Sequence, residues 1–267
     1  MSAPPKYLIF DIESVADGAL IAKVRYPGEG LDPAGAIRKY RDELMAQFNS
    51  DFIPYTFQIP HCVAVAKIGA DYALQDLVLL DDPQFRPHVI VENFWRGWEA
   101  YRRPTLVTFN GRGFDVPLLE LAAYRYGISV PTWFGGTKYD QPRNRYNAGA
   151  HLDLQEVLTN FGAVRFTGGL NLAASVLGKP GKMDVQGDMV QDLVDAGRGA
   201  EVRDYCRCDV LDTYFVFLRT RVLVGDLTRD AEAELVADAV AWATAQGEKH
   251  PCYLEYLKKS TPWENPW

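Results

Sequence analysis

Long apolar runs and organised cysteine patterns are both missing from this sequence of 267 residues. No stretch approaches the roughly 20 apolar residues that a transmembrane helix needs, and Met1–Lys6 shows no basic-then-apolar signal pattern. The four cysteines, Cys62, Cys206, Cys208 and Cys252, lack the paired spacing of a metal site and are too few for a disulfide framework. These absences predict a soluble, cytoplasmic protein with no membrane partner.

Positive charge is also scarce. The chain has 28 Lys and Arg residues against 35 Asp and Glu residues, a net charge of -7. Proteins that coat nucleic acid through charge carry a basic surface, so this balance excludes tight, non-specific coating. It excludes neither a local basic groove nor a site built from carboxylates. The hydrophobic fraction of 48% is too high for a disordered chain, and the length suits one α/β domain.

Predicted strands lie early in the chain and predicted helices late. Stretches rich in β-branched and aromatic residues occur at 7–13, 61–68, 74–80 and 105–110. Helical periodicity occurs at 89–101, 115–126, 154–161, 170–177, 185–196, 200–224 and 231–245. An insertion at about 15–60 carries its own helix at 34–48, and 129–150 is a long loop. This order predicts a mixed β-sheet flanked by helices, in one domain spanning 1–267 with a helical extension at about 228–267.

The first motif is Asp11-x-Glu13, within the first predicted strand. Residues i and i+2 of a strand point to the same face, so the two carboxylates lie side by side. Two carboxylates on a buried strand are costly unless a cation lies between them, and hard oxygen ligands suit Mg²⁺ or Mn²⁺. The second copy of the pattern, Asp230-x-Glu232, is interpreted as the solvated face of an acidic helix. A buried position is what distinguishes the first copy.

The second motif is Asn110-x-x-x-Phe114-Asp115, where a strand ends, turns through Gly111 and Gly113, and a helix begins. The glycines allow the backbone to approach a ligand closely. The alternative for Asp115 is an ordinary helix N-cap.

The third motif is Tyr205-x-x-x-Asp209 in a predicted helix. The spacing i, i+4 places the phenol and the carboxylate on one helical face. The alternative is a tyrosine that simply packs against the core. The same spacing at Tyr7/Asp11 and Tyr72/Asp76 lies in or beside strands, where the two side chains are far apart.

These motifs, in this order, resemble the DEDDy 3'-5' exonucleases of the ribonuclease H-like superfold. The sequence is most similar to a stand-alone bacterial family related to the proofreading exonuclease domain of family-B DNA polymerases. The segments 151–154, 177–182 and 209–219 also resemble that family, and the resemblance spans about 7–227. It implies an α/β, ribonuclease H-like fold with a helical C-terminal half.

The resemblance also implies roles for individual residues. The four carboxylates would hold two Mg²⁺ or Mn²⁺ ions, and they are Asp11, Glu13, Asp115 and Asp209. Tyr205 would orient the attacking water. The terminal nucleotides of a DNA or RNA 3' end would lie against Ser14, Asn110 and Phe114, although Phe114 could equally be a core residue. Phosphate contacts are expected at Lys138, Arg143, Arg145 and Lys182, for which a solvated loop is the alternative. His151 is interpreted as structural.

The resemblance thus implies a two-metal 3'-5' exonuclease that acts on single-stranded nucleic acid and releases nucleoside monophosphates. Two other interpretations stay open: an endonuclease on the same fold, and a non-catalytic nucleic-acid-binding module. The five intact motif side chains argue against the module, and Tyr205 argues against the endonuclease. The sequence does not separate DNA from RNA, and a monomer is the default expectation.

Overall fold

A computed structural model describes residues 3–137, 139–181, 187–264 and 266–267. One five-stranded sheet runs through it in the order β3-β2-β1-β4-β5. β1 is antiparallel to β2, and β2 to β3, whereas β4 is parallel to both β1 and β5. The strands are β1 (Tyr7–Ala16), β2 (Gln58–Ile68), β3 (Leu74–Leu79), β4 (Thr105–Thr108) and β5 (His151–Asp153). The predicted mixed sheet is therefore confirmed.

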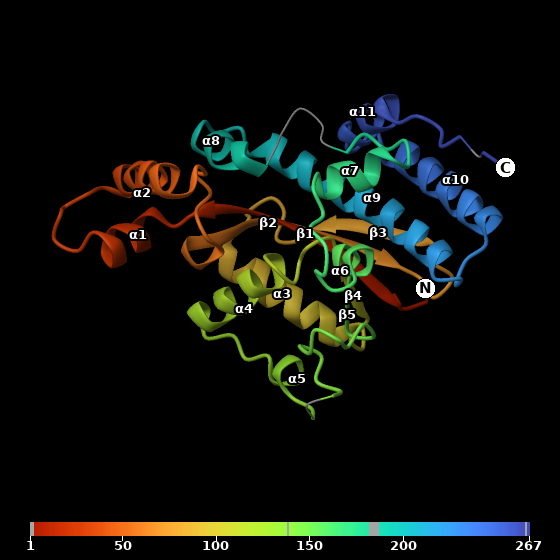
Figure 1. Cartoon of the computed structure of the whole chain (residues 1–267), viewed down its shortest axis with the longest axis horizontal. Coiled ribbons are helices and arrows are strands. Elements are labelled where there is room, and N and C mark those ends of the chain that lie inside the picture. Colours follow the sequence, from red (N-terminus) through yellow and green to blue (C-terminus); the bar gives the residue numbers. More distant parts are fainter. Residues whose placement is uncertain (1–2, 138, 182–186, 265) are drawn as a thin grey trace.

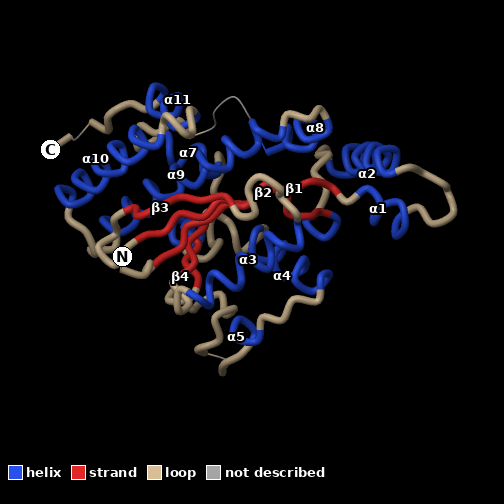
Figure 2. The backbone as a smooth tube through the Cα atoms, turned by 180° about the vertical axis from the view of Figure 1, so that it is seen from behind, coloured by secondary structure: helices blue, strands red, loops and turns tan. Residues whose placement is uncertain are grey.

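Helices cover both faces of the sheet (Figures 1 and 2). On one face lie α3 (Pro87–Ala100) and α4 (Asp115–Tyr126). On the other lie α7 (Gly169–Ser175), α9 (Gly199–Leu223), α10 (Arg229–Gln246) and α11 (Cys252–Lys259). The segment between α4 and α9 also holds the short helices α5 (Pro131–Phe134), α6 (Leu154–Thr159), 3-10 helix η2 (Gly187–Met189) and α8 (Val190–Asp195). In the described part of the chain, no helix combines the length and hydropathy that a bilayer crossing requires.

Alternate residues of β1 face the two helical layers. Leu8, Phe10 and Ile12 belong to the core beneath α3 and α4, while Ile9 belongs to the core beneath α9. This is the period of two expected of a strand buried on both sides. The same alternation turns Asp11 and Glu13 toward α9 as the strand continues.

Helix α9 runs antiparallel to β1 across the sheet. At one end the rings of Tyr7 and Phe217 lie 5.0 Å apart, and further along Cys206 Sγ lies 3.5 Å from the Asp11 carbonyl oxygen. The helix rises about 16 Å between these contacts, and the strand rises about 13 Å. The two elements therefore lie side by side over this length, and the N-terminal half of α9 reaches the C-terminal part of β1.

The insertion between β1 and β2 forms a small unit at one end of the sheet (Figure 1). It holds α1 (Gly18–Arg25), α2 (Pro33–Phe48) and 3-10 helix η1 (Tyr55–Phe57). Its own apolar core is Ile21, Tyr26, Ala36, Tyr40, Leu44 and Ile53. Asp32 caps α2 by accepting from the Gly35 N–H at 2.7 Å, and Pro33 occupies the first turn. The helix predicted at 34–48 is confirmed as α2, whereas the sequence pattern did not predict α1.

Other differences between pattern and structure lie at short elements. α5 falls inside the predicted loop 129–150, and β5 has only three residues. α11 lies beyond the last predicted helix and packs its buried face, Cys252, Tyr253 and Tyr256, into the core under α9. α5 and β5 are shorter than a periodic pattern needs, so tertiary packing defines them, whereas α11, with eight residues, is as long as the predicted helix 170–177 and was not predicted.

Candidate active site

A cleft of about 490 Å³ opens where β1 and β4 end. It collects side chains from β1, the turn before α4, α9, and the insertion. Its lining includes all five predicted catalytic side chains, Asp11, Glu13, Asp115, Tyr205 and Asp209, and three of the predicted substrate contacts, Ser14, Asn110 and Phe114. Segments that are remote in sequence thus meet at one surface.

Three of the carboxylates form a compact group. Oxygen atoms of Asp11, Glu13 and Asp209 all lie within 4.8 Å of one another. Glu13 is buried, and Asp11 and Asp209 are partly exposed toward the cleft. The geometry follows from two periodicities, because β1 presents every second residue to α9 and the helix brings Asp209 opposite them.

Asp115 is the buried fourth carboxylate and the first residue of α4. The N-cap position belongs to Phe114, which makes no side-chain capping bond, so the N-cap interpretation of Asp115 is wrong. Asp115 lies outside the compact group, but the charge of Asp11 is the second cause, after burial, of its raised pKa. Asp115 and Asp11 line the same cleft, and their charges interact.

The turn that carries Asp115 is held by Asp153 at the end of β5. The Asp153 carboxylate accepts hydrogen bonds from the backbone N–H groups of Asn110 and Arg112, both at 2.9 Å. Asn110 adopts φ of 64°, a left-handed conformation that asparagine tolerates better than most residues. At Gly111 a Cβ atom would lie 2.5 Å from Thr108, so no larger residue fits there. Asp153 lies in the segment 151–154 that resembles the family, but no motif in the sequence indicates its role in holding the turn.

Burial and mutual repulsion oppose ionisation of these carboxylates. Burial raises the pKa of Asp11 from 3.8 to about 6. Burial, followed by the neighbouring charges of Asp11 and Asp209, raises the pKa of Glu13 well above its usual value. The site therefore favours bound protons or cations over free carboxylates.

Tyr205 lies on the same face of α9 as Asp209, one turn earlier, and is buried. Burial, and then the charges of Asp209, Glu13 and Asp11, raise its pKa far above the ordinary value of 10. The phenol accordingly stays protonated and serves as a hydrogen-bond donor rather than as a base.

Two aromatic rings face each other at the cleft rim. Phe114 is half-buried against the core under α4, and its ring centroid lies 5.8 Å from that of Phe52. Phe52 comes from the insertion and is 58% exposed. The insertion also supplies Arg41, which pairs with Asp51 at 3.9 Å and with Asp192 at 3.4 Å. No motif in the sequence points to these residues, because the insertion has the least resemblance to the family; the available signal was the aromatic residue Phe52 beside Asp51.

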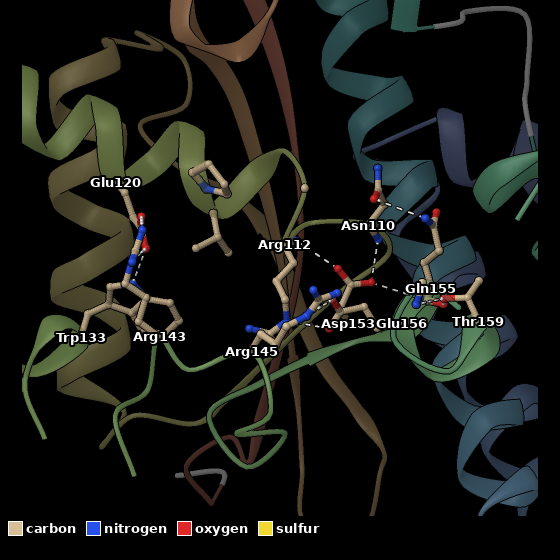
Figure 3. Close-up of a pocket in the computed structure, with 14 residues that line it drawn as sticks. Asn110, Arg112, Glu120, Trp133, Arg143, Arg145, Asp153, Gln155, Glu156 and Thr159 are labelled. Atoms are coloured by element: carbon tan, nitrogen blue, oxygen red, sulfur yellow. Dashed lines mark hydrogen bonds and ion pairs between the residues drawn. The ribbon is translucent and has the colours of Figure 1, made fainter. Parts of the chain in front are cut away.

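The remaining predicted residues lie in four different places. Ser14 lies on the cleft wall at a β-bulge, and its hydroxyl donates to the Gln58 side chain. Arg145 lies outside this cleft, in a neighbouring groove, paired with Glu156 (Figure 3). Lys182 and Lys138 fall outside the described residues. His151 is fully buried in β5, away from the cleft lining, with Nε2 2.8 Å from the Thr108 hydroxyl.

Comparison with known proteins identifies the family. The sequence model of a family described as a predicted 3'-5' exonuclease related to the exonuclease domain of PolB matches residues 50–260. The chain belongs to this family. Asp115, Tyr205 and Asp209 lie within the matched residues, and Asp11 and Glu13 precede them. The five-stranded mixed sheet with its flanking helices agrees with the α/β architecture predicted from the sequence.

Among solved structures, the family B DNA polymerase from the hyperthermophilic archaeon Pyrobaculum calidifontis is similar at a TM-score of 0.48 and 16% identity. The match covers 82% of this chain and 25% of the polymerase chain. This exonuclease-family chain therefore spans about a quarter of the length of that polymerase. A search of curated proteins gives no match.

Proposed function

We propose that residues 1–267 form one exonuclease domain that removes nucleoside monophosphates from the 3' end of single-stranded nucleic acid, using two divalent ions. The observation that carries the proposal is the convergence of four carboxylates and a protonated phenol on one cleft. A compact carboxylate group alone is common on protein surfaces. Here it is joined by a buried Asp115 and by Tyr205, in a member of an exonuclease family.

The residues present fit divalent cations. Asp11, Glu13 and Asp209 offer oxygen atoms within 4.8 Å of one another, and burial disfavours their free charges. Oxygen donors of this kind suit Mg²⁺ or Mn²⁺. In the proposal, these three side chains hold one ion, and Asp115 acts with Asp11 toward a second. When bound, two ions supply the charge that stabilises the attacking and leaving oxygens, and they lower the pKa of water.

The side chains of the chain itself position the reacting groups. The Tyr205 hydroxyl, kept protonated by its surroundings, is proposed to hold the attacking water in line with the terminal phosphodiester. Asn110, exposed at the turn, and the backbone of Ser14 are proposed to contact the terminal nucleotide. Asp153 fixes the turn and thereby places both Asn110 and Asp115.

The aromatic pair supports an unpaired end as substrate. The rings of Phe52 and Phe114 lie 5.8 Å apart beside the carboxylates, and a terminal base is proposed to stack against them. Stacking of this kind accepts any base and needs a base free of its complement. We infer from this a preference for single strands.

The deciding experiment is digestion of a 5'-labelled single strand with Mg²⁺ or Mn²⁺, beside the same reaction in EDTA and with Asp11→Ala. A metal-dependent ladder shortening one nucleotide at a time from the 3' end supports the proposal. Internal cuts in a strand whose 3' end is blocked would identify an endonuclease. Binding without cleavage, unaffected by Asp11→Ala, would identify a binding module. Matched DNA and RNA strands in parallel give the substrate preference.

A further inference from the structure

A second groove of about 470 Å³ adjoins the carboxylate cleft (Figure 3). The two share Asn110 and Gly113, so the turn before α4 forms the ridge between them. The walls of the groove come from α4, α6 and the loop that follows α5. It contains three arginines, Arg112, Arg143 and Arg145.

Arg143 and Arg145 lie outermost and their carboxylate partners lie beneath them, whereas Arg112 is as buried as Glu156, its partner at 2.9 Å. Arg143 donates from Nε and Nη2 to the two carboxylate oxygens of Glu120, at 2.8 and 2.9 Å. The Arg143 side chain is 53% exposed, and that of Glu120 is 12% exposed. Arg145 pairs with Glu156 in the same way, at 49% against 14% exposure. A guanidinium has five N–H donors in a planar fork, so an edge held by a carboxylate leaves another for a second anion. The groove surface is therefore cationic, although its three arginines are balanced by three carboxylates, Glu120, Asp153 and Glu156.

Exposed aromatic rings accompany these arginines. Tyr146 and Phe161 are 69% and 47% exposed, with ring centroids 5.2 Å apart, and Arg145 Nη2 donates to the Phe161 carbonyl at 3.3 Å. Arg143 lies over the exposed ring of Phe134, 5.5 Å from its centroid. Arginines interleaved with exposed rings are the surface by which proteins hold the backbone and stack the bases of a single strand.

We propose that the strand 5' of the bond to be cut leaves the carboxylate cleft past Asn110 and Gly113 and runs along this groove. Its phosphates contact the arginines and its bases lie against the exposed rings. Among the described residues that line the cleft itself, Arg41 is the one cation, and Asp51 and Asp192 already hold it. A polyanionic strand therefore needs its cationic contacts outside the cleft. This inference rests on the proposed exonuclease function.

The test compares a long substrate with one that fills only the cleft. The long substrate is a 5'-labelled strand of about 12 nucleotides, as DNA and as RNA, and the short one is the p-nitrophenyl ester of thymidine 5'-monophosphate. In Arg143→Gln/Arg145→Gln, we expect kcat/KM for the strand, relative to the ester, to fall about tenfold through KM. The slope of log KM against log salt should shrink by about 1.4, since each lost phosphate contact removes about 0.7. Arg96→Gln, which changes an exposed arginine paired with Glu92 on α3, is the control that should change neither quantity.

A second double variant is expected to change KM for the strand in the opposite direction. Glu120→Gln/Glu156→Gln removes the competing carboxylates, so it should lower KM for the strand. Equal losses on strand and ester in both double variants, or an unchanged ratio and salt slope in the arginine variant, would overturn the groove assignment. If the wild-type protein cleaves neither substrate, the exonuclease proposal fails separately. Fluorescence anisotropy of the labelled strand then decides the groove: weaker binding by the arginine variant alone supports it, and equal binding refutes it.

Discussion

Replacing Asp11 by asparagine should stabilise the metal-free protein near neutral pH. Burial raises the pKa of Asp11 from 3.8 to about 6, so its proton is held more tightly in the folded than in the unfolded chain. The favourable contribution is complete below pH 3.8 and is lost as the pH rises through about 6. The shift corresponds to about 3 kcal/mol, and the partial exposure of Asp11 at the cleft floor lowers the expected effect to about 1–3 kcal/mol.

The assay is urea unfolding in EDTA at several pH values between about 4.5 and 7.5. The advantage of Asp11→Asn over wild type should grow with pH across this window. Asp42→Asn, which changes an exposed carboxylate on α2, should show no such trend. If the difference in unfolding free energy does not change with pH, or if Asp11→Asn is less stable than wild type at pH 7.5, the claim that the uncompensated charge of Asp11 destabilises the metal-free protein is refuted.

Divalent ions should reverse the order of stability. A ligand at about 100 times its Kd adds about 2.7 kcal/mol to the form that binds it. For a chain of this size that corresponds to a rise in Tm of about 5–10 °C. Wild type should gain this stabilisation from Mn²⁺, and Asp11→Asn should lose most of it. Equal shifts in both proteins would place the ion elsewhere.

Four further substitutions test separate parts of the site. Asp209→Ala should reduce the cleavage rate by at least about 10³-fold. Tyr205→Phe removes one hydrogen bond to a charged group, so its rate should be only about 10- to 100-fold below wild type. Equal losses in the two variants would contradict the role of the phenol. Phe52→Ala should raise KM for single strands by about 5- to 100-fold with little change in stability, unlike the exposed Phe48→Ala on α2, which is expected to be silent. Gly111→Ala should lower unfolding free energy by about 1–3 kcal/mol in a thermal melt, because its Cβ would lie 2.5 Å from Thr108, while Gly97→Ala meets no atom within 4 Å and should cost nothing.

The sequence predicts the sheet and the carboxylate positions because both depend on simple periodicities. A period of two on β1 turns Asp11 and Glu13 toward α9, and a spacing of four on α9 turns Tyr205 and Asp209 toward them. The structure places all four in one cleft. Local spacing was enough for these four residues because Asp11 and Glu13 lie within β1 and Tyr205 and Asp209 lie within α9.

Other parts of the site depend on contacts that no local pattern encodes. Phe52 reaches Phe114 only because the insertion folds over the end of β1, and the insertion has no motif of its own. Asp153 holds the turn at Asn110 from a three-residue strand, 43 positions away in sequence. Arg145 was predicted as a phosphate contact without its partner Glu156 or its groove, since ion pairs between loop and helix follow from tertiary folding.

The net charge of -7 is compatible with a nucleic-acid substrate because of where the charges lie. The cleft carboxylates bear charges that their surroundings disfavour, so bound divalent ions would offset them at the point of cleavage. Next to the cleft, Glu120 and Glu156 lie under Arg143 and Arg145, so opposite charges are separated in depth rather than along the surface. A strand then meets cations locally on a protein that repels it overall. Such an arrangement favours binding that is confined to the strand end and dissociates readily. This suits an enzyme that must move along its substrate after every cut.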